Sequence, residues 1–162
     1  MSEEPKNFKP VISDFDQYLI GEGSHNQLWR VLGANVIKQQ TQKGVHFAVW
    51  APNAQRVSVI GSFNDWNDDQ SPMSPAGNTG VWEIFVSDLG EGALYKFRIT
   101  GADSVVRDKA DPVGFGSQHP PEKASVVRDI DNYNWKDADW IKKRGTTADR
   151  HQPVSIYEVH LV

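Results

Sequence analysis

VSVIGSFNDWN, the sequence of residues 57–67, passes directly from an apolar run into a polar turn. Val57 to Ile60 have the β-branched composition of a buried strand, and Gly61 is expected to end that strand. The Ser, Asn and Asp side chains that follow hydrogen-bond readily to nearby backbone, so they favour a turn over a strand ladder. The stretch therefore predicts a β-sheet protein with one tryptophan, Trp66, on the rim of a loop.

A tryptophan on a loop rim beside amide side chains suits the binding of a pyranose ring. The C–H face of a sugar packs on an aromatic plane, and Asn64 and Asn67 can hydrogen-bond the hydroxyl groups at the edge of the sugar. Two other interpretations stay open at this point. The ring of Trp66 can fold back onto the sheet as a lid, or it can belong to a surface for a protein partner.

Short strands continue on both sides of this stretch. Runs of β-branched and aromatic residues, separated by Pro, Gly, Asn and Asp, lie at 45–50, 56–60, 81–86 and 95–100, with weaker candidates at 104–107 and 124–128. No helix-length pattern separates them, so we predict an all-β fold, an immunoglobulin-like antiparallel β-sandwich. The chain has no cysteine, so the cysteine pair of true immunoglobulin domains is absent and the likeness is one of architecture.

The strand predicted at 95–100 carries a second candidate binding residue. Tyr95, Phe97 and Ile99 alternate toward the core, which places Lys96 on the opposite face. A lysine amine is a hydrogen-bond donor only, and it can bond two neighbouring sugar hydroxyls. The alternative is a solvated lysine on an outward face.

Apolar residues at helical spacing precede the strands. Ser13 can cap a short helix that Gly21 ends, and a second short helix is expected from Ser24 to Gly33. Both helices are expected to pack on a larger body through their apolar faces. These faces consist of Phe15, Tyr18 and Leu19 in the first helix and of Leu28, Val31 and Leu32 in the second.

The chain thus divides into four predicted segments. They are an N-terminal arm with short helices at 1–35, the β-sandwich at 36–130, a polar linker at 131–153 and a terminal apolar strand at 154–162. Trp50 and Trp82 fall within predicted strands and are expected in the core. Trp135 and Trp140 are expected to anchor the linker.

The composition excludes several classes of protein. Hydrophobic residues make up 38% and charged residues 23% of the chain, as in an ordinary soluble globular domain. The net charge of −4 and the scattered Lys and Arg residues argue against a nucleic-acid partner. No apolar run reaches the roughly 20 residues of a bilayer-spanning helix, so no membrane partner is expected. Residues 1–6 do not resemble a secretory signal, and a cytoplasmic location is expected.

No motif for catalysis, metal binding or cofactor binding is found. The histidines include no i, i+4 pair, and the chain contains neither a glycine-rich phosphate loop nor a Gly-x-Ser-x-Gly elbow. Asp65, Asp68 and Asp69 lie close together, but aspartates on a turn mostly bond to nearby backbone. We therefore predict no catalytic residue, no metal site and no cofactor.

Several ordered motifs resemble those of a glycogen-binding type module. They are GVHFAVWAPNA at 44–54, VSVIGSFNDWN at 57–67, GVWE at 80–83 and ALYKF at 93–97. This module is the β-sandwich ahead of the catalytic barrel in branching and debranching members of the α-amylase superfamily, and it also occurs in the β subunit of AMP-activated kinase. Residues 21–34 and 156–161 further resemble the lead-in and the first barrel strand of bacterial 1,4-α-glucan (glycogen) branching enzymes.

The resemblance implies roles for two residues. In the kinase-subunit relatives a tryptophan of the matching turn and a lysine of the matching strand contact glucan, and these positions are Trp66 and Lys96 here. A second stacking tryptophan of those relatives has no counterpart near 101–103, which predicts a weak site.

The resemblance also implies that 154–162 is the first strand of a (β/α)8 barrel whose remainder, with its catalytic carboxylates, is missing. The expected function is that of a non-catalytic N-terminal segment of a branching enzyme, which docks α-1,4-glucan (glycogen or maltooligosaccharides) or braces the intramolecular catalytic barrel. The intact enzyme forms α-1,6 branches by a retaining glycosyl transfer. The alternatives are a stand-alone α-glucan-binding or scaffolding module, and a sandwich that packs on the barrel without sugar affinity.

Overall fold

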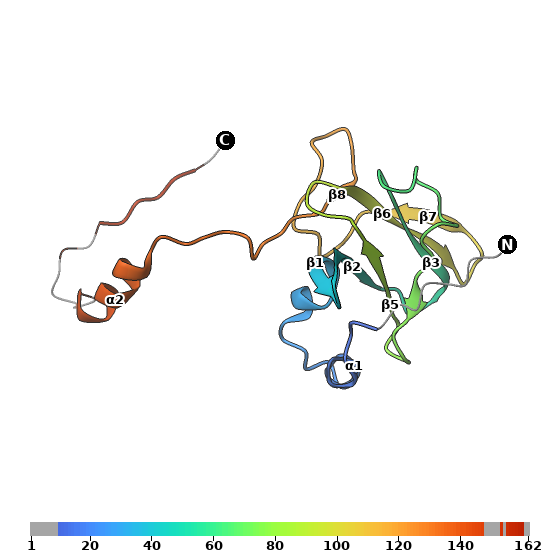
Figure 1. Cartoon of the computed structure of the whole chain (residues 1–162), viewed down its shortest axis with the longest axis horizontal. Coiled ribbons are helices and arrows are strands. Elements are labelled where there is room, and N and C mark those ends of the chain that lie inside the picture. Colours follow the sequence, from blue (N-terminus) through green and yellow to red (C-terminus); the bar gives the residue numbers. More distant parts are fainter. Residues whose placement is uncertain (1–9, 148–152, 154, 161–162) are drawn as a thin grey trace. The chain divides into compact units, whose positions relative to one another are not determined.

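The computed structural model describes residues 10–147, 153 and 155–160. The chain forms two compact units, which adjoin in the sequence between Ile130 and Asp131. Every strand of the described residues lies in the first unit (Figure 1).

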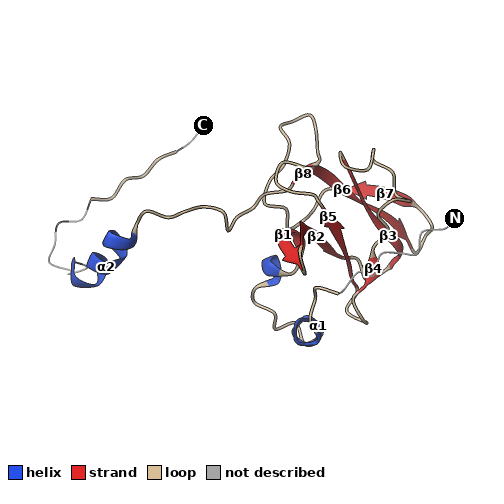
Figure 2. Cartoon of the chain, viewed as in Figure 1, coloured by secondary structure: helices blue, strands red, loops and turns tan. Residues whose placement is uncertain are grey.

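The first unit is a sandwich of two antiparallel sheets, and Figure 2 shows its strands gathered together. One sheet has the order β1-β2-β5-β4, formed by Gly33–Gln39, Gln42–Trp50, Val81–Ser87 and Ser74–Pro75. The other has the order β3-β6-β7, formed by Ala54–Gly61, Leu94–Gly101 and Val106–Lys109, and the short β8 (Ser125–Val126) also pairs with β6. The predicted antiparallel β-sandwich is confirmed.

The main core lies between the two sheets and follows the predicted alternation. Val57 and Val59 of β3 and Tyr95 and Phe97 of β6 are fully buried in it, together with Phe47 of β2. The Phe47 and Tyr95 rings meet edge to face with their centroids 5.0 Å apart. Each such side chain stabilises the fold by about 1.5–3 kcal/mol relative to an exposed position.

A second apolar cluster covers the outer face of the β1-β2-β5-β4 sheet. It contains Ile12, Leu32, Ala48, Ala76 and Val81. The chain segment before α1 is held to this face by Glu83 of β5, whose Oε2 accepts hydrogen bonds from the backbone N–H groups of Val11 (3.0 Å) and Ile12 (3.2 Å). Val11 and Ile12 are thus held to the sandwich by hydrogen bonds to Glu83.

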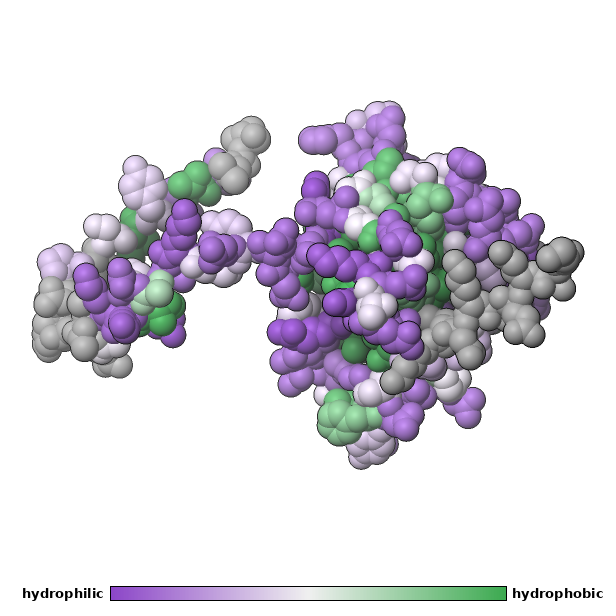
Figure 3. Space-filling model, in the orientation of Figure 1, coloured by the Kyte–Doolittle hydropathy of each residue, from purple (hydrophilic) through white to green (hydrophobic). Residues whose placement is uncertain are grey.

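Helix α1 (Asp14–Gly21) begins where the sequence predicts, but it turns a different face to the sheet. Ser13 caps it, with its Oγ accepting from the N–H of Asp16 at 3.1 Å. The expected contact residues Phe15 and Tyr18 are 67% and 61% exposed, and Figure 3 shows hydrophobic surface over α1. Ile20 packs on the second cluster instead, because the burial of Ile12 fixes how the chain enters the helix.

The second predicted helix is reduced to one 3₁₀ turn, η1 (Leu28–Arg30). Gly33 adopts a φ of +88°, a conformation that favours glycine, and β1 begins there. β1 was not predicted, because the polar residues Lys38 and Gln39 interrupt the strand pattern where it pairs with β2. The predicted boundary between arm and sandwich at residue 35 therefore falls inside a strand.

Short strands occur near both of the weaker candidates. β7 overlaps the candidate at 104–107, and β8 covers only two residues of the candidate at 124–128. β4 was not predicted; it pairs with β5 for two residues at the edge of its sheet. Its Pro75 suits an edge strand, where a missing N–H costs nothing.

The second unit contains a helix where a polar linker was predicted. α2 spans Ala138–Thr147, and its Trp140 (61%) and Ile141 (44%) remain exposed. Neither described helix is long and apolar enough to cross a membrane.

The apolar segment predicted as a terminal strand is not a strand in the described residues 155–160. Ile156 and Tyr157 are 89% and 93% exposed. A strand needs a neighbour for its backbone hydrogen bonds, and no described strand pairs with this segment. Residues 154, 161 and 162 of the predicted strand lie outside the described residues.

Candidate functional site

The turn after β3 is built around the buried side chain of Asn64. This residue is only 4% exposed. Its Oδ1 accepts from the N–H of Gly61 at 2.8 Å, and its Nδ2 donates to the Val59 carbonyl at 3.0 Å and to Ser71 Oγ at 3.1 Å. Because the amide points inward, the structure contradicts the prediction that Asn64 bonds a sugar. Asn64 shapes the turn instead.

The next two residues adopt the left-handed backbone conformation. Asp65 has a φ of +51° and Trp66 a φ of +59°, which is rare for a bulky side chain and costs on the order of 1–3 kcal/mol per residue. Backbone hydrogen bonds hold the conformation: the N–H of Trp66 donates to the Gly61 carbonyl at 3.0 Å, and the N–H of Asn67 donates to the Asn64 carbonyl at 2.9 Å. The turn therefore gives Trp66 one defined position.

The structure brings Trp66 and Lys96 together. The Lys96 Nζ lies 5.9 Å from the centroid of the Trp66 ring, within the range of a cation–π contact. Lys96 pairs across the sheet with Ile60, so the turn folds back over the point where β6 passes the end of β3. Trp66 retains 37% exposure, so the ring is not a fully buried lid.

Ion pairs fasten the same turn to the outer face of its sheet. Asp68 lies between Arg98 (3.3 Å) and Arg56 (3.7 Å), and Arg56 also pairs with Asp69 at 2.8 Å. Arg98 in addition bonds Asp108 of β7 at 2.7 Å and holds the pKa of that carboxyl below its ordinary value. Exposed pairs are individually weak, but this network fixes the loop on two strands.

Asn67 keeps an exposed side chain on the turn. Its Oδ1 accepts from the N–H of Asp69 at 2.9 Å, an Asx turn that orients the amide. Asn67 therefore stays a candidate for contact with a ligand, beside Trp66 and Lys96.

Sequence reasoning misplaced several other tryptophans. Trp50 was expected in the core but is 61% exposed, because Phe47 and Val49 of β2 face the core and alternation turns Trp50 to the outer face of its sheet. Trp82 is partly buried against the core, and its Nε1 donates to the Ala51 carbonyl at 3.1 Å. Trp135 and Trp140 are 72% and 61% exposed, so the expected burial of anchors is not observed. The alternation of Val45, Phe47 and Val49 is the signal that could have placed Trp50 on the outer face.

Comparison with known families identifies the module. Residues 31–114 match the model of carbohydrate-binding module 48 (isoamylase N-terminal domain). The chain belongs to this family. The matched residues of this carbohydrate-binding module begin just before β1 and end after β7, so they include β1 to β7 and the turn that carries Trp66, but not β8.

Curated relatives extend the similarity beyond the module. The chain is 58% identical to the 1,4-alpha-glucan branching enzyme of Roseobacter denitrificans, over 98% of this chain and 22% of the relative. It is 48% identical to that of Nocardia farcinica, over 95% of this chain and 21% of the relative. The chain thus matches the N-terminal region of these enzymes and spans about a fifth of their length.

Solved structures show the same sandwich. A pullulanase from Klebsiella pneumoniae complexed with maltotriose aligns with a TM-score of 0.50 and 27% identity, over 62% of this chain and 10% of that one. A putative alpha amylase from Salmonella typhimurium aligns with a TM-score of 0.50 and 24% identity, over 67% of this chain and 16% of that one. The second likeness concerns the fold alone.

Proposed function

We propose that this module docks α-1,4-glucan for a 1,4-α-glucan branching enzyme, with Trp66 and Lys96 as its contact residues. The observation that carries the proposal is that the exposed Trp66 ring, on a turn with a left-handed backbone, lies 5.9 Å from the Lys96 amine of β6. Membership in a carbohydrate-binding family supports a sugar as the ligand, and the branching enzymes among the relatives support an α-glucan.

Each group has a defined part in this proposal. The C–H face of a glucose unit stacks on the Trp66 indole, and the Lys96 amine donates to hydroxyl groups at the rim of that sugar. The exposed Asn67 amide adds a further polar contact. Because Asn64 and the arginine pairs hold the turn in place without ligand, little conformational entropy is lost on binding.

A single aromatic contact predicts weak affinity for short sugars. One such contact contributes about 0.5–1.5 kcal/mol beyond the buried area, whereas a dissociation constant of 1 mM already requires about 4.1 kcal/mol. We therefore infer that binding to a polymer, where many identical units compete for the site, is the relevant event.

The reaction itself is assigned in this proposal to a (β/α)8 barrel that follows the module in an intact cytoplasmic enzyme. There an α-1,4 link is cleaved with formation of a covalent glycosyl-enzyme, and the freed segment is transferred to a 6-hydroxyl, with retention of configuration. This chain is then a docking and bracing segment without catalytic carboxylates of its own. Purified chain is expected to leave the iodine absorbance of amylose unchanged, and a reproducible spectral shift would refute this part of the proposal.

Retardation in a native gel that contains glycogen tests the contact residues. Trp66→Ala is expected to weaken binding about threefold to tenfold, in line with loss of one aromatic contact, and Lys96→Met is expected to weaken it less. Trp140→Ala is the matched control, since Trp140 is a 61% exposed tryptophan in the second unit. Equal retardation of the parent and Trp66→Ala, with unchanged circular dichroism, would reject the site.

One observation favours a second role as a brace for the barrel. Phe15 and Tyr18 of α1 are exposed, and because they are three residues apart they lie on the same face of the helix. Exposed aromatic rings of this kind commonly mark a protein contact. A bracing role without sugar affinity is indicated if the parent chain shows no glycogen retardation while Phe15→Ser raises its solubility or lowers its binding of a hydrophobic dye.

A further inference from the structure

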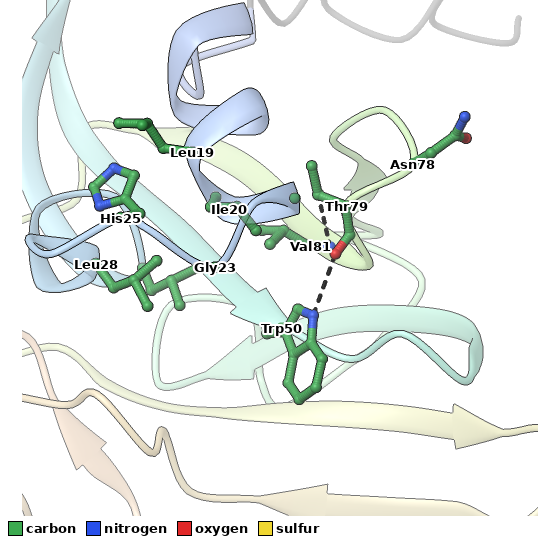
Figure 4. Close-up of a pocket in the computed structure, with 11 residues that line it drawn as sticks. Leu19, Ile20, Gly23, His25, Leu28, Trp50, Asn78, Thr79 and Val81 are labelled. Atoms are coloured by element: carbon green, nitrogen blue, oxygen red, sulfur yellow. Dashed lines mark hydrogen bonds between the residues drawn. The ribbon is translucent and has the colours of Figure 1, made fainter.

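The ring of Trp66 is positioned by the backbone of its turn and not by its own indole N–H. The indole N–H groups of Trp50 and Trp82 each donate to a carbonyl, that of Thr79 at 3.2 Å (Figure 4) and that of Ala51 at 3.1 Å. Among the described residues, no such hydrogen bond involves Trp66 Nε1. Since 37% of the Trp66 surface is exposed, the place of the ring depends on what holds the turn.

The turn is anchored on both sides of the ring. Its first half is held at the end of β3 by the buried Asn64 amide. Its second half begins at Asp68 and leads to residues 71–73, which hydrogen-bond the backbone of β3. The left-handed residues Asp65 and Trp66 lie between these two anchors. A movement of either anchor therefore changes the direction in which the ring points.

The second anchor, Asp68, is attached to two strands at once. Its Oδ1 lies 3.3 Å from Arg98 Nη1 of β6, and its Oδ2 lies 3.7 Å from Arg56 Nη1 of β3. Its backbone carbonyl also accepts from Arg56 Nη2 at 3.2 Å. All three oxygen atoms of Asp68 thus have a cationic partner, and the residue cannot move without losing contacts to both strands.

The direction of the Arg98 side chain is fixed independently of Asp68. Its Nε and Nη2 donate to the two carboxylate oxygens of Asp108 at 2.7 and 2.9 Å, a two-point pair that orients a planar guanidinium. The remaining Nη1 is directed to Asp68. Arg98 and, less strongly, Lys96 lower the pKa of Asp108. A continuous set of charges therefore joins Asp68 to the Lys96 amine that faces the Trp66 ring.

We propose that Asp68 is a positioning residue of the glucan site formed by Trp66 and Lys96. The inference rests on the proposed function for its ligand, an α-glucan. Asp68 does not contact the sugar; it holds the second half of the turn so that the Trp66 ring stands beside the Lys96 amine. Loss of the Asp68 charge releases this half of the turn from both arginines, and the ring then leaves the position in which a glucose unit can stack between it and the amine.

This brace makes the binding of an uncharged ligand sensitive to salt. A glucan carries no charge, so its stacking and hydroxyl contacts depend little on ionic strength. The ion pairs of Asp68 are partly exposed to solvent, and added salt screens such pairs. Glucan binding is therefore expected to weaken at high ionic strength, and a variant without the Asp68 charge should lose this dependence.

NMR titration of the intact chain with maltoheptaose tests the proposal. The reporter is the indole N–H signal of Trp66, assigned with Trp66→Phe. Asp68→Asn keeps the size of the side chain and removes its charge. It is expected to shift the Trp66 signal of the free protein and to raise the dissociation constant about threefold, the effect of losing one exposed ion pair.

Asp103→Asn is the matched control. Asp103 forms a two-point pair with Arg107, at 2.7 and 3.0 Å, outside the turn, so this variant removes the same charge from the same sheet. It is expected to change neither the Trp66 signal nor the dissociation constant. If Asp68→Asn binds as the parent does, or if both variants weaken binding equally, the proposal is overturned and the proposed function stands. A parent whose Trp66 signal does not respond to maltoheptaose refutes the proposed function itself.

The same titration at about 20 mM and about 500 mM NaCl gives an independent measure. The parent and Asp103→Asn should bind more weakly at the higher salt concentration, whereas Asp68→Asn should bind equally at both. Should Asp68→Asn fail to fold, the salt series of the parent decides, because a dissociation constant that does not change with salt also overturns the role of Asp68.

Discussion

Removing the Glu83 carboxylate should detach the N-terminal segment from the sandwich. Glu83 is 2% exposed, and its Oε2 accepts from His46 Nε2 at 2.9 Å and from the N–H groups of Val11 and Ile12. Glu83→Ala leaves two buried donors, His46 Nε2 and the N–H of Ile12, and the partly buried N–H of Val11 without their acceptor, and it loosens Ile12. Breaking a buried, charged hydrogen-bond set of this kind costs about 3–5 kcal/mol, which is a large part of the roughly 5–15 kcal/mol that holds a domain together.

Urea denaturation followed by tryptophan fluorescence measures this loss. With a slope of about 1–3 kcal/mol per molar urea, the midpoint of Glu83→Ala should fall by about 2 M. Glu83→Gln keeps one carbonyl acceptor and should cost less, about 1–2 kcal/mol. Glu91→Ala is the control, because Glu91 is exposed and its ion pair with Arg128, at 3.4 Å, joins two exposed side chains. A Glu83→Ala midpoint equal to that of Glu91→Ala would refute the reasoning.

Three further predictions concern pH and the turn. Arg98 lowers the pKa of Asp108. The ionised Asp108 therefore stabilises the fold above its unfolded pKa of about 3.9, and this stabilisation is lost as the pH falls through its folded pKa. Carboxyl NMR should show that Arg98→Met raises the folded pKa of Asp108. Burial raises the pKa of Asp111, so the contribution of Asp111 to stability is present below about pH 3.9 and is lost as the pH rises through its folded pKa. A titration midpoint of Asp111 below about 3.9 in the same NMR experiment would contradict this. Gly61→Ala places a Cβ 2.2 Å from the Leu94 carbonyl oxygen of β6. The variant should lose at least about 1–3 kcal/mol of folding free energy and show less retardation by glycogen. A folded variant with the retardation of the parent would count against the role of the turn.

The local sequence was sufficient to predict burial wherever side chains alternate between the two faces of a strand. The alternation from Tyr95 predicted that Phe97 is buried and that Lys96 faces outward, and the burial of these residues confirms it. The capping box of α1 was also predictable at Ser13, since it involves residues three apart. Such features depend on neighbours in the sequence, and their physical cause is local geometry.

The sequence alone therefore determined the sandwich and the turn that carries Trp66, because strand alternation and turn chemistry are short-range. Only the tertiary structure decided which side chains of that turn face solvent. The sequence predicted Asn64 as a ligand contact, but in the folded chain its Nδ2 donates hydrogen bonds to the Val59 carbonyl and to Ser71 Oγ. Trp50 was predicted in the core, yet it lies on the outer face of its sheet, where the second apolar cluster leaves it 61% exposed. Strand alternation gives the face on which a side chain lies, but how much of that face is covered depends on segments that are far apart in the sequence.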